Sequence, residues 1–451
     1  MTHRNCINAI ILISTLTLIS GEAAAISVLG NLRVGAYTRT VEFEEPVNGS
    51  TDNDEQVMSA QMKMDVTDFD AKNDAFVIDL RDKIDSYGRL DTQNLKLDTY
   101  NRFQVREMAF KRPFEYNKFY FTLGRFSLIE ANVLDNDGAE IGYRWSKESR
   151  ISFFGGVAPK DVITPYYVTP NTSSVNNAQA GLYYSYDKKN GLERSIYTNN
   201  AIAMGPTYFI TDKKSHTYFY HMAIWNINQQ NRVSSYVQQD FAPKATLRRA
   251  SLSHSYFNPK FQTNLSLLQT NTEDYLIQQD ILDPLPPSGE QFVRLDLRHR
   301  MFNFLSMDYF ASFGKREADG KTQSEYALGV ILPKLLSTNG SLRAQYGIRN
   351  NYVSKDNYIR GGYDYWNQYF SASLIHTIMK QEYEDGFENK RQISMIDGGF
   401  FLNDRVRGSL AYQIEKDDKL SASAFFLMLG YRFGNGAVAP IRTKPALFEE
   451  I

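Results

Sequence analysis

The sequence SASAFFLMLGYRFGNGAVAP, residues 421–440, follows a strict alternation near the end of the chain. Every second position from 425 to 433 is large and apolar or aromatic: Phe425, Leu427, Leu429, Tyr431 and Phe433. A β-strand sends successive side chains to opposite faces, so this pattern predicts a strand with one apolar face. The surface that such a face meets decides the fold of the whole chain.

The bulk composition narrows the class of protein. The chain has 451 residues, of which 42% are hydrophobic and 22% are charged, with a mean hydropathy of -0.43. This excludes a disordered polyelectrolyte and a bundle of membrane helices. Aromatic residues make up 14% of the chain, and they favour strands and membrane interfaces. The net charge of -1 gives no general attraction to nucleic acid, so we expect no nucleic-acid partner.

The amino terminus has the pattern of a secretory signal peptide. Arg4 supplies a positive charge, residues 7–19 form a short apolar stretch, and residues 23–25 are the small residues of a cleavage site. We therefore expect residues 1–25 to be removed and export to follow. The single cysteine, Cys6, lies in this segment, so the expected mature chain has no thiol, disulfide or cysteine metal site.

Alternation of period two recurs through the rest of the sequence. In EQFVRLDLRH, for example, Val293 and Leu295 alternate with Arg294 and Asp296. Because a bilayer offers no hydrogen bonds, strands that cross it must close into a barrel with an apolar outer face. A soluble β-sandwich would show the same alternation of apolar and polar residues, so the lengths of the connections between strands must distinguish it from a membrane barrel.

The predicted connections alternate between short and long. Short turns are expected at residues 258–260, 366–368 and 402–404, and longer polar connections at residues 41–56, 158–177, 228–245, 271–290 and 379–390. Membrane barrels combine short periplasmic turns with long external loops. The sequence therefore predicts an all-β fold, a single even-stranded antiparallel transmembrane β-barrel of about 18–22 strands. We expect the barrel over residues 26–433 and a periplasmic tail over residues 434–451, which we interpret as an inert extension rather than a docking peptide.

Two segments resemble a known group of proteins. The ending FLMLGYRF, residues 426–433, is similar to the terminal assembly signal of Gram-negative outer-membrane β-barrel proteins. Residues 123–156 are similar to porin-like barrels such as the alginate-export group. The resemblance implies a location in the cell outer membrane, recognition by the barrel-assembly machinery and contact with outer-membrane lipid. The chain departs from the pattern by continuing 18 residues beyond Phe433.

The polar residues at alternate positions of the predicted strands form the candidate site. If the apolar parity meets lipid, mostly basic residues line the interior, and rings of arginine favour anions in a pore. The alternative is that inward arginines pair with carboxylates across strands and fill the barrel without conduction. The candidate pore-lining residues are Arg81, Lys83, Arg102, Arg106, Arg144, Arg150, Arg294, Asp296, Arg298, Arg343, Arg349 and Arg407.

Two functions remain open at this point. The first is a porin-like channel for passive diffusion of small hydrophilic solutes, with a preference for anions as one option. The second is a non-conducting barrel whose external loops mediate surface adhesion or partner binding. The histidines are scattered and no metal, phosphate or calcium motif is present, so we expect neither an enzyme nor a cofactor. Loops 158–177 and 271–290 are long enough to fold inward as a constriction. The sequence gives no oligomeric state.

Overall fold

The computed structural model describes residues 27–434 except for gaps in its connections. The gaps are residues 48–49, 68–73, 88–97, 116, 160–177, 191–193, 207–214, 243–244, 272–288, 318, 336 and 404. The expected signal peptide and almost all of the expected tail lie outside the described residues. Within them, no helix is long and apolar enough to cross a bilayer.

The described chain forms one antiparallel sheet of 22 strands and a single turn of 3-10 helix, η1. The elements are β1 (Ser27–Val47), β2 (Ser50–Thr67), β3 (Ala75–Tyr87), β4 (Asp98–Arg112), β5 (Phe119–Leu128), η1 (Ile129–Ala131), β6 (Val133–Arg144), β7 (Ser149–Val157), β8 (Ala178–Asn190), β9 (Arg194–Pro206), β10 (Ser215–Asn226), β11 (Asn231–Ala242), β12 (Thr246–Phe257), β13 (Phe261–Asn271), β14 (Gly289–Phe302), β15 (Leu305–Arg316), β16 (Thr322–Pro333), β17 (Gly340–Asn350), β18 (Ser354–Trp366), β19 (Phe370–Tyr383), β20 (Glu388–Phe401), β21 (Val406–Lys416) and β22 (Leu420–Gly434).

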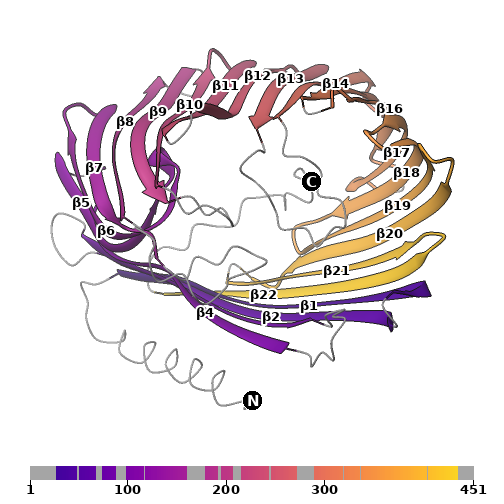
Figure 1. Ribbon diagram of the computed structural model, residues 1–451, viewed down its shortest axis with the longest axis horizontal. Helices are drawn as coiled ribbons and strands as arrows, with labels where there is room; N and C mark the ends of the chain where they lie inside the picture. Colours follow the sequence, from indigo (N-terminus) through magenta and orange to yellow (C-terminus); the bar gives the residue numbers. More distant parts are fainter. Residues whose placement is uncertain are drawn as a thin grey trace.

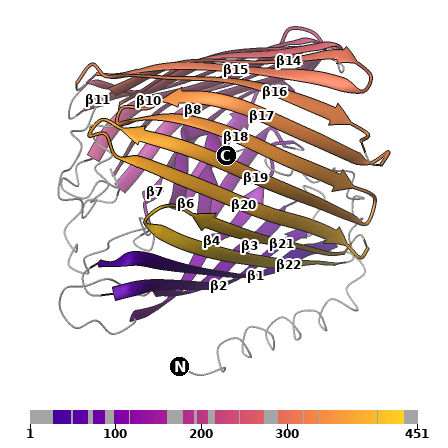
Figure 2. The same ribbon diagram turned by 90° about the vertical axis from the view of Figure 1, so that its right-hand side faces the viewer.

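The sheet closes on itself. Each strand pairs with the next along the chain, and β1 pairs with β22 from Leu29 opposite Gly434 to Phe43 opposite Leu420. Figure 1 shows the resulting ring of strands, and Figure 2 shows β14–β22 as one continuous tilted wall. Closure gives every strand two partners, so no edge is left unpaired. The prediction of a single all-β barrel with an even number of strands is confirmed, at the upper end of its range.

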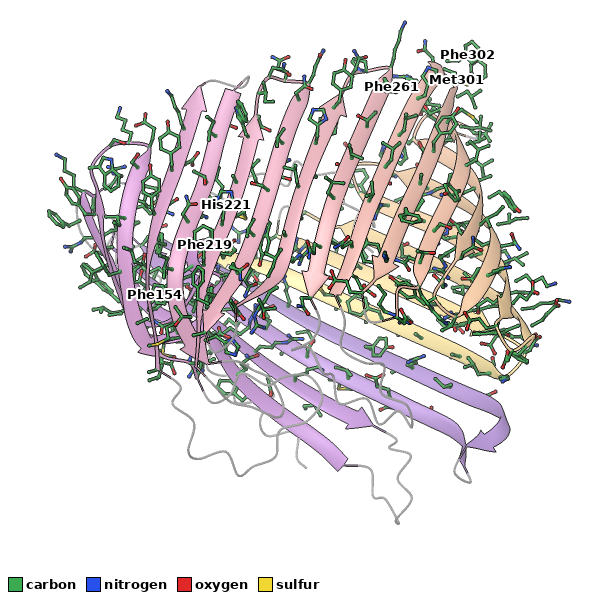
Figure 3. All side chains as sticks on the ribbon, turned by 45° about the horizontal axis from the view of Figure 1, so that its top comes forward. Phe154, Phe219, His221, Phe261, Met301 and Phe302 are labelled. Atoms are coloured by element: carbon green, nitrogen blue, oxygen red, sulfur yellow. The ribbon has the colours of Figure 1, made fainter. Side chains whose placement is uncertain are left out.

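The outer face is apolar. Large hydrophobic side chains such as Ile141, Leu295 and Leu429 are exposed on it, as a membrane barrel requires. Aromatic pairs gather at the end of the barrel where β1 begins and β22 ends. Trp145 stacks on Tyr184 there, with ring centroids 5.6 Å apart. Figure 3 places Phe261, Met301 and Phe302 at one rim of the barrel. Such a girdle is typical of a membrane interface.

Three predicted connections are wrong in length. The expected loop 41–56 is mostly strand, because β1 and β2 stay paired as far as Glu42 opposite Asp52. The expected loop 228–245 contains β11, and most of 379–390 belongs to β19 and β20. Polar composition misled the prediction, because strands can extend beyond an apolar belt while their backbone groups remain paired. The short turns are confirmed to within two residues at each end.

Candidate functional site

Strand register sorts the side chains into inner and outer rows. Arg294 of β14 lies opposite Ser266 of β13 and Ser312 of β15, whereas Leu295 lies opposite Leu265 and Ala311. Polar rows therefore alternate with apolar rows across neighbouring strands. Since the apolar rows are exposed on the outside, the polar rows line the inner wall. This wall is the candidate site.

A depression of about 520 Å³ lies in the inner wall formed by β12–β18. Arg294 Nε lies 2.9 Å from Asp296 Oδ2, and Arg298 Nε lies 2.7 Å from Asp308 Oδ1. The side chains of Arg294 and Arg298 remain 57% and 51% exposed. Ion pairs this exposed contribute about 0–1 kcal/mol each, so their groups can exchange partners at little cost.

Two further residues shape the same depression. Glu325 accepts a hydrogen bond of 2.8 Å from the hydroxyl of Tyr358, whose ring lies over Gly347. Arg360 donates to Thr377 Oγ1 at 3.3 Å and has no carboxylate partner within the described part of the chain. The depression therefore presents three guanidinium groups and three carboxylates. The sequence prediction included Arg294, Asp296 and Arg298 but missed Asp308, Tyr358 and Arg360 as their neighbours.

The predicted residues Arg343 and Arg349 are also paired. Arg343 Nη2 donates to both carboxylate oxygens of Asp364, at 2.7 and 2.6 Å. Arg349 Nε donates to Asp356 Oδ2 at 2.8 Å, and Asp356 is fully buried. Ser354 also donates to this carboxylate. These pairs connect β17 with β18, so they also hold the inner faces of the two strands together.

The basic residues predicted on β3 and β4 lie close together in register. Arg81 lies opposite Gln61 of β2, and Lys83 lies opposite Arg102 of β4. Nothing is described of the Arg102 side chain. Arg106 is skipped by the register, because Asp79 pairs with Glu107 and the next residue of β3 pairs with Val105. This β-bulge leaves Arg106 Nη1 3.9 Å from Asp79 Oδ2.

The remaining predicted residues lie toward the end of the barrel that carries both described termini. Arg144 and Arg150 face each other in register, and Arg144 donates to the carbonyl of Glu115 at 2.9 Å. Arg150 is buried and pairs with Glu130 of η1 at 2.6 Å, over the ring of Phe114. Arg407 lies opposite Gly430 of β22.

The connection between β5 and β6 folds into the barrel. Gly124 has φ +116°, and a Cβ there would lie 2.3 Å from the carbonyl oxygen of Met108, so only glycine fits. Beyond this point the hairpin crosses the inner faces of the following strands, and η1 contacts β8 and β9. Tyr218 of β10 donates to the carbonyl of Ala131 at 3.1 Å. Asn132, at the tip, adopts the left-handed conformation that closes the turn.

Apolar packing holds this inward hairpin against the wall. Phe126, Leu128 and Ala131 are buried in a cluster with residues of β4 and β7–β10, and Tyr236 of β11 packs against the cluster. The barrel therefore contains a local hydrophobic core on one side of its lumen. Because the hairpin occupies space inside the ring, it narrows the passage along β5–β11 and acts as a constriction.

Glu140 of β6 anchors the wall beneath the hairpin. This buried carboxylate accepts hydrogen bonds from Thr122 at 3.0 Å and from Ser152 at 2.9 Å, and a third from the hydroxyl of Tyr183. A buried charge is costly unless it is fully hydrogen-bonded. The three donors come from β5, β7 and β8, so Glu140 ties four neighbouring strands together.

A second buried charged group lies near the opposite end of the wall. Asp240 of β11 accepts from Arg248 and lies 3.1 Å from Nδ1 of His216. Arg248 Nη2 is 2.9 Å from the same imidazole nitrogen. Asp240 and Arg248 are both buried. The group joins β10, β11 and β12, and its role in this arrangement is to hold these strands together.

Sequence reasoning sought a constriction elsewhere. It considered loops 158–177 and 271–290 for this role and favoured their lying over the rim; residues 160–177 and 272–288 are outside the described residues, so neither alternative is tested there. The signal for the observed hairpin was the set of glycines at 124, 138, 155 and 156, which align across β5, β6 and β7. At Gly138 and Gly156 an added Cβ would also meet the backbone of the neighbouring strand.

Comparisons with known proteins give weak likenesses only. No protein-family model matches the sequence, and no curated protein matches it. Among solved structures, OpdQ of Pseudomonas aeruginosa is 10% identical, with a TM-score of 0.43 over 91% of this chain and 98% of that one. OccAB4 of Acinetobacter baumannii is 9% identical, with a TM-score of 0.40 over 90% and 98%. The translocation pore of the P pilus usher PapC is 10% identical, with a TM-score of 0.46 over 90% and 100%. The description of this barrel therefore depends on its own strand pairing.

Proposed function

We propose that the chain is a porin-like channel of the Gram-negative outer membrane through which small hydrophilic solutes diffuse passively. One observation carries the proposal: a closed 22-strand barrel has an apolar outer face and, on its inner wall, a depression lined by exposed arginine and aspartate side chains. A barrel of this strand number is wide enough to hold water once its lumen is not filled by side chains. Among the described residues, Arg294 and Arg298 of this wall keep about half of their side-chain surface exposed.

The mechanism depends on the geometry of the lumen and the charge of its wall, and it involves no catalytic turnover. A solute that enters the lumen exchanges part of its hydration for the guanidinium and carboxylate groups of the depression. The hairpin at β5–β6 restricts its size from the opposite side. A preference for anions remains a prediction, because the depression itself carries three guanidinium groups and three carboxylates.

Several parts of the proposal concern biogenesis and location. The apolar outer face with its aromatic girdle would sit in outer-membrane lipid, and the barrel-assembly machinery would insert it after removal of residues 1–25. The tail from residue 434 and the resemblance to alginate-export porins remain predictions, as does the alternative of a non-conducting adhesion barrel. The proposed channel performs no catalysis.

The test is electrical. Purified protein in a planar bilayer should give stepwise currents, and a salt gradient should give a reversal potential. The double variant Arg294→Glu and Arg298→Glu should move the permeability ratio toward cations by about threefold, because wall charges set potentials of order kT or more. Lys315→Glu is the matched control, since Lys315 is exposed on the outer parity of β15. A correctly folded barrel that stays silent would refute the channel.

A further inference from the structure

Three arginines meet at the junction where the barrel closes. Arg407 of β21 and Arg33 of β1 lie opposite Gly430 of β22 from its two sides. Arg432 lies two residues along β22 on the same face. Gly430 has no side chain to separate the flanking arginines, and Cγ and Nε of Arg407 lie 3.3 Å from the position that a Cβ there would take. The closure of the ring therefore brings the first strand and the last two strands together in one basic group.

This group differs in its charge balance from the inner-wall arginines of β14 and β17. Arg294, Arg298, Arg343 and Arg349 each have a carboxylate partner. Among the residues that the structure describes, none of Arg33, Arg407 and Arg432 forms an ion pair. Arg407 is repelled electrostatically by both of the others. Nε of Arg33 is buried and has no hydrogen-bond partner in the described chain.

Such an arrangement is unfavourable without a counter-charge. Like charges in close proximity raise the free energy of the folded barrel, and a buried N–H without an acceptor costs about 1–3 kcal/mol. The residues next to the group in register, Asn31 and Gln61, are uncharged and cannot neutralise it. An oxyanion removes both costs, because guanidinium groups donate pairs of parallel hydrogen bonds to carboxylate or phosphate oxygens.

We propose that Arg33, Arg407 and Arg432 form a discrete binding site for an oxyanion, a phosphate or carboxylate group, near the end of the lumen that carries both described termini. The inference depends on the proposed channel for its role, which is to hold an anionic solute at that end of the passage. The site itself is distinct from the depression, which lies in the wall of β12–β18.

The oxyanion has two possible sources with the same chemistry. One is a solute from solution. The other is the chain itself, because the residues that follow Gly434 include Glu449 and Glu450. The experiment must separate these sources, and both require the three arginines.

Binding is measured by titrating inorganic phosphate into the full chain in detergent, with calorimetry as the readout. Wild-type protein should bind, and Arg407→Gln and Arg33→Gln should each weaken binding about tenfold, as loss of a charge-assisted hydrogen bond predicts. Arg391→Gln is the matched control. It removes an inner-wall arginine on β20 that pairs with Glu415 at 2.6 Å, and it should leave phosphate binding unchanged.

The double variant Glu449→Gln and Glu450→Gln identifies the source. Unchanged affinity assigns the site to solutes, and raised affinity shows that the chain's own carboxylates compete for the same arginines. Absence of phosphate binding in both the wild type and this variant, or binding that survives Arg407→Gln and Arg33→Gln, overturns the site. The channel and the anion site can be refuted independently. A barrel that binds phosphate but does not conduct supports the site and refutes the channel. A barrel that conducts but does not bind phosphate supports the channel and refutes the site.

Discussion

The two sides of the lumen differ in what their inner faces contact. Along β5–β9 the polar rows are covered: Ser152, Asn199 and Tyr183 are almost completely buried, and an inward hairpin packs on them. Along β13–β15 the polar rows are more open, and the side chains of Arg294 and Arg298 are half-exposed. Both sides have the same alternation in sequence, so alternation alone sets the face of a residue but not its surroundings.

The difference between the two sides shows how burial changes the interactions that a charged residue requires. On the covered side Glu140 is surrounded by three hydroxyl donors, because a buried carboxylate must be satisfied by the protein. On the open side Asp296 has a single arginine partner, and water can supply the rest. The covered side therefore contributes rigidity, and the open side remains available for solutes. The predictions below compare matched substitutions on the two sides.

The largest effect is expected from truncation of the hairpin core. Phe126→Ala should lower the free energy of unfolding by about 3–5 kcal/mol, because Phe126 is 1% exposed and a cavity would remain. It should also raise single-channel conductance, since the constriction loses its anchor. Phe310→Ala, in the open depression, should cost about 1 kcal/mol. Urea unfolding in detergent and bilayer recording measure the two effects. Equal costs for both variants would contradict the comparison.

A smaller difference is expected for the two carboxylates. Glu140→Ala leaves the hydroxyls of Tyr183, Ser152 and Thr122 without their common acceptor, which should cost about 2–3 kcal/mol. Asp296→Ala breaks an exposed pair and should cost less than about 1 kcal/mol. Both can be followed by the change in gel mobility between folded and boiled protein after stepwise heating. A Glu140 variant as stable as the wild type would show that the buried hydrogen bonds contribute nothing.

The smallest effect concerns the rim opposite the termini. Asp319, in the connection between β15 and β16, accepts hydrogen bonds from Arg316, which lower the pKa of this carboxyl to about 2. A lowered pKa stabilises the folded state above the ordinary value near 3.8, and this contribution is lost as the pH falls through about 2. Carbon-detected NMR of the Asp319 carboxyl between pH 5 and pH 1.5 measures the midpoint, with Arg316→Gln as the reference. A midpoint near 3.8 in the wild type would show that the ion pair does not form.

Much of the fold could be predicted because it depends on residues that are close together in the sequence. Residues such as Val293 and Arg294 alternate for a reason that acts within one strand, the two-residue repeat of the extended backbone. The turn at residues 258–260 is equally local. The prediction of a long loop at residues 41–56 was wrong, because polar residues there continue a paired strand. Among the candidate residues, alternation did not indicate which carboxylate each arginine would contact.

The sequence by itself determined the period of two, the apolar parity from Phe425 to Phe433 and hence the need for a closed barrel in lipid, because these depend on neighbours in the chain and on the bilayer. Long-range strand pairing was needed to establish the strand number, the inward hairpin at Gly124 and the position of Arg33 and Arg407 on either side of Gly430. These depend on pairing between distant segments and on backbone conformations that alternation does not encode.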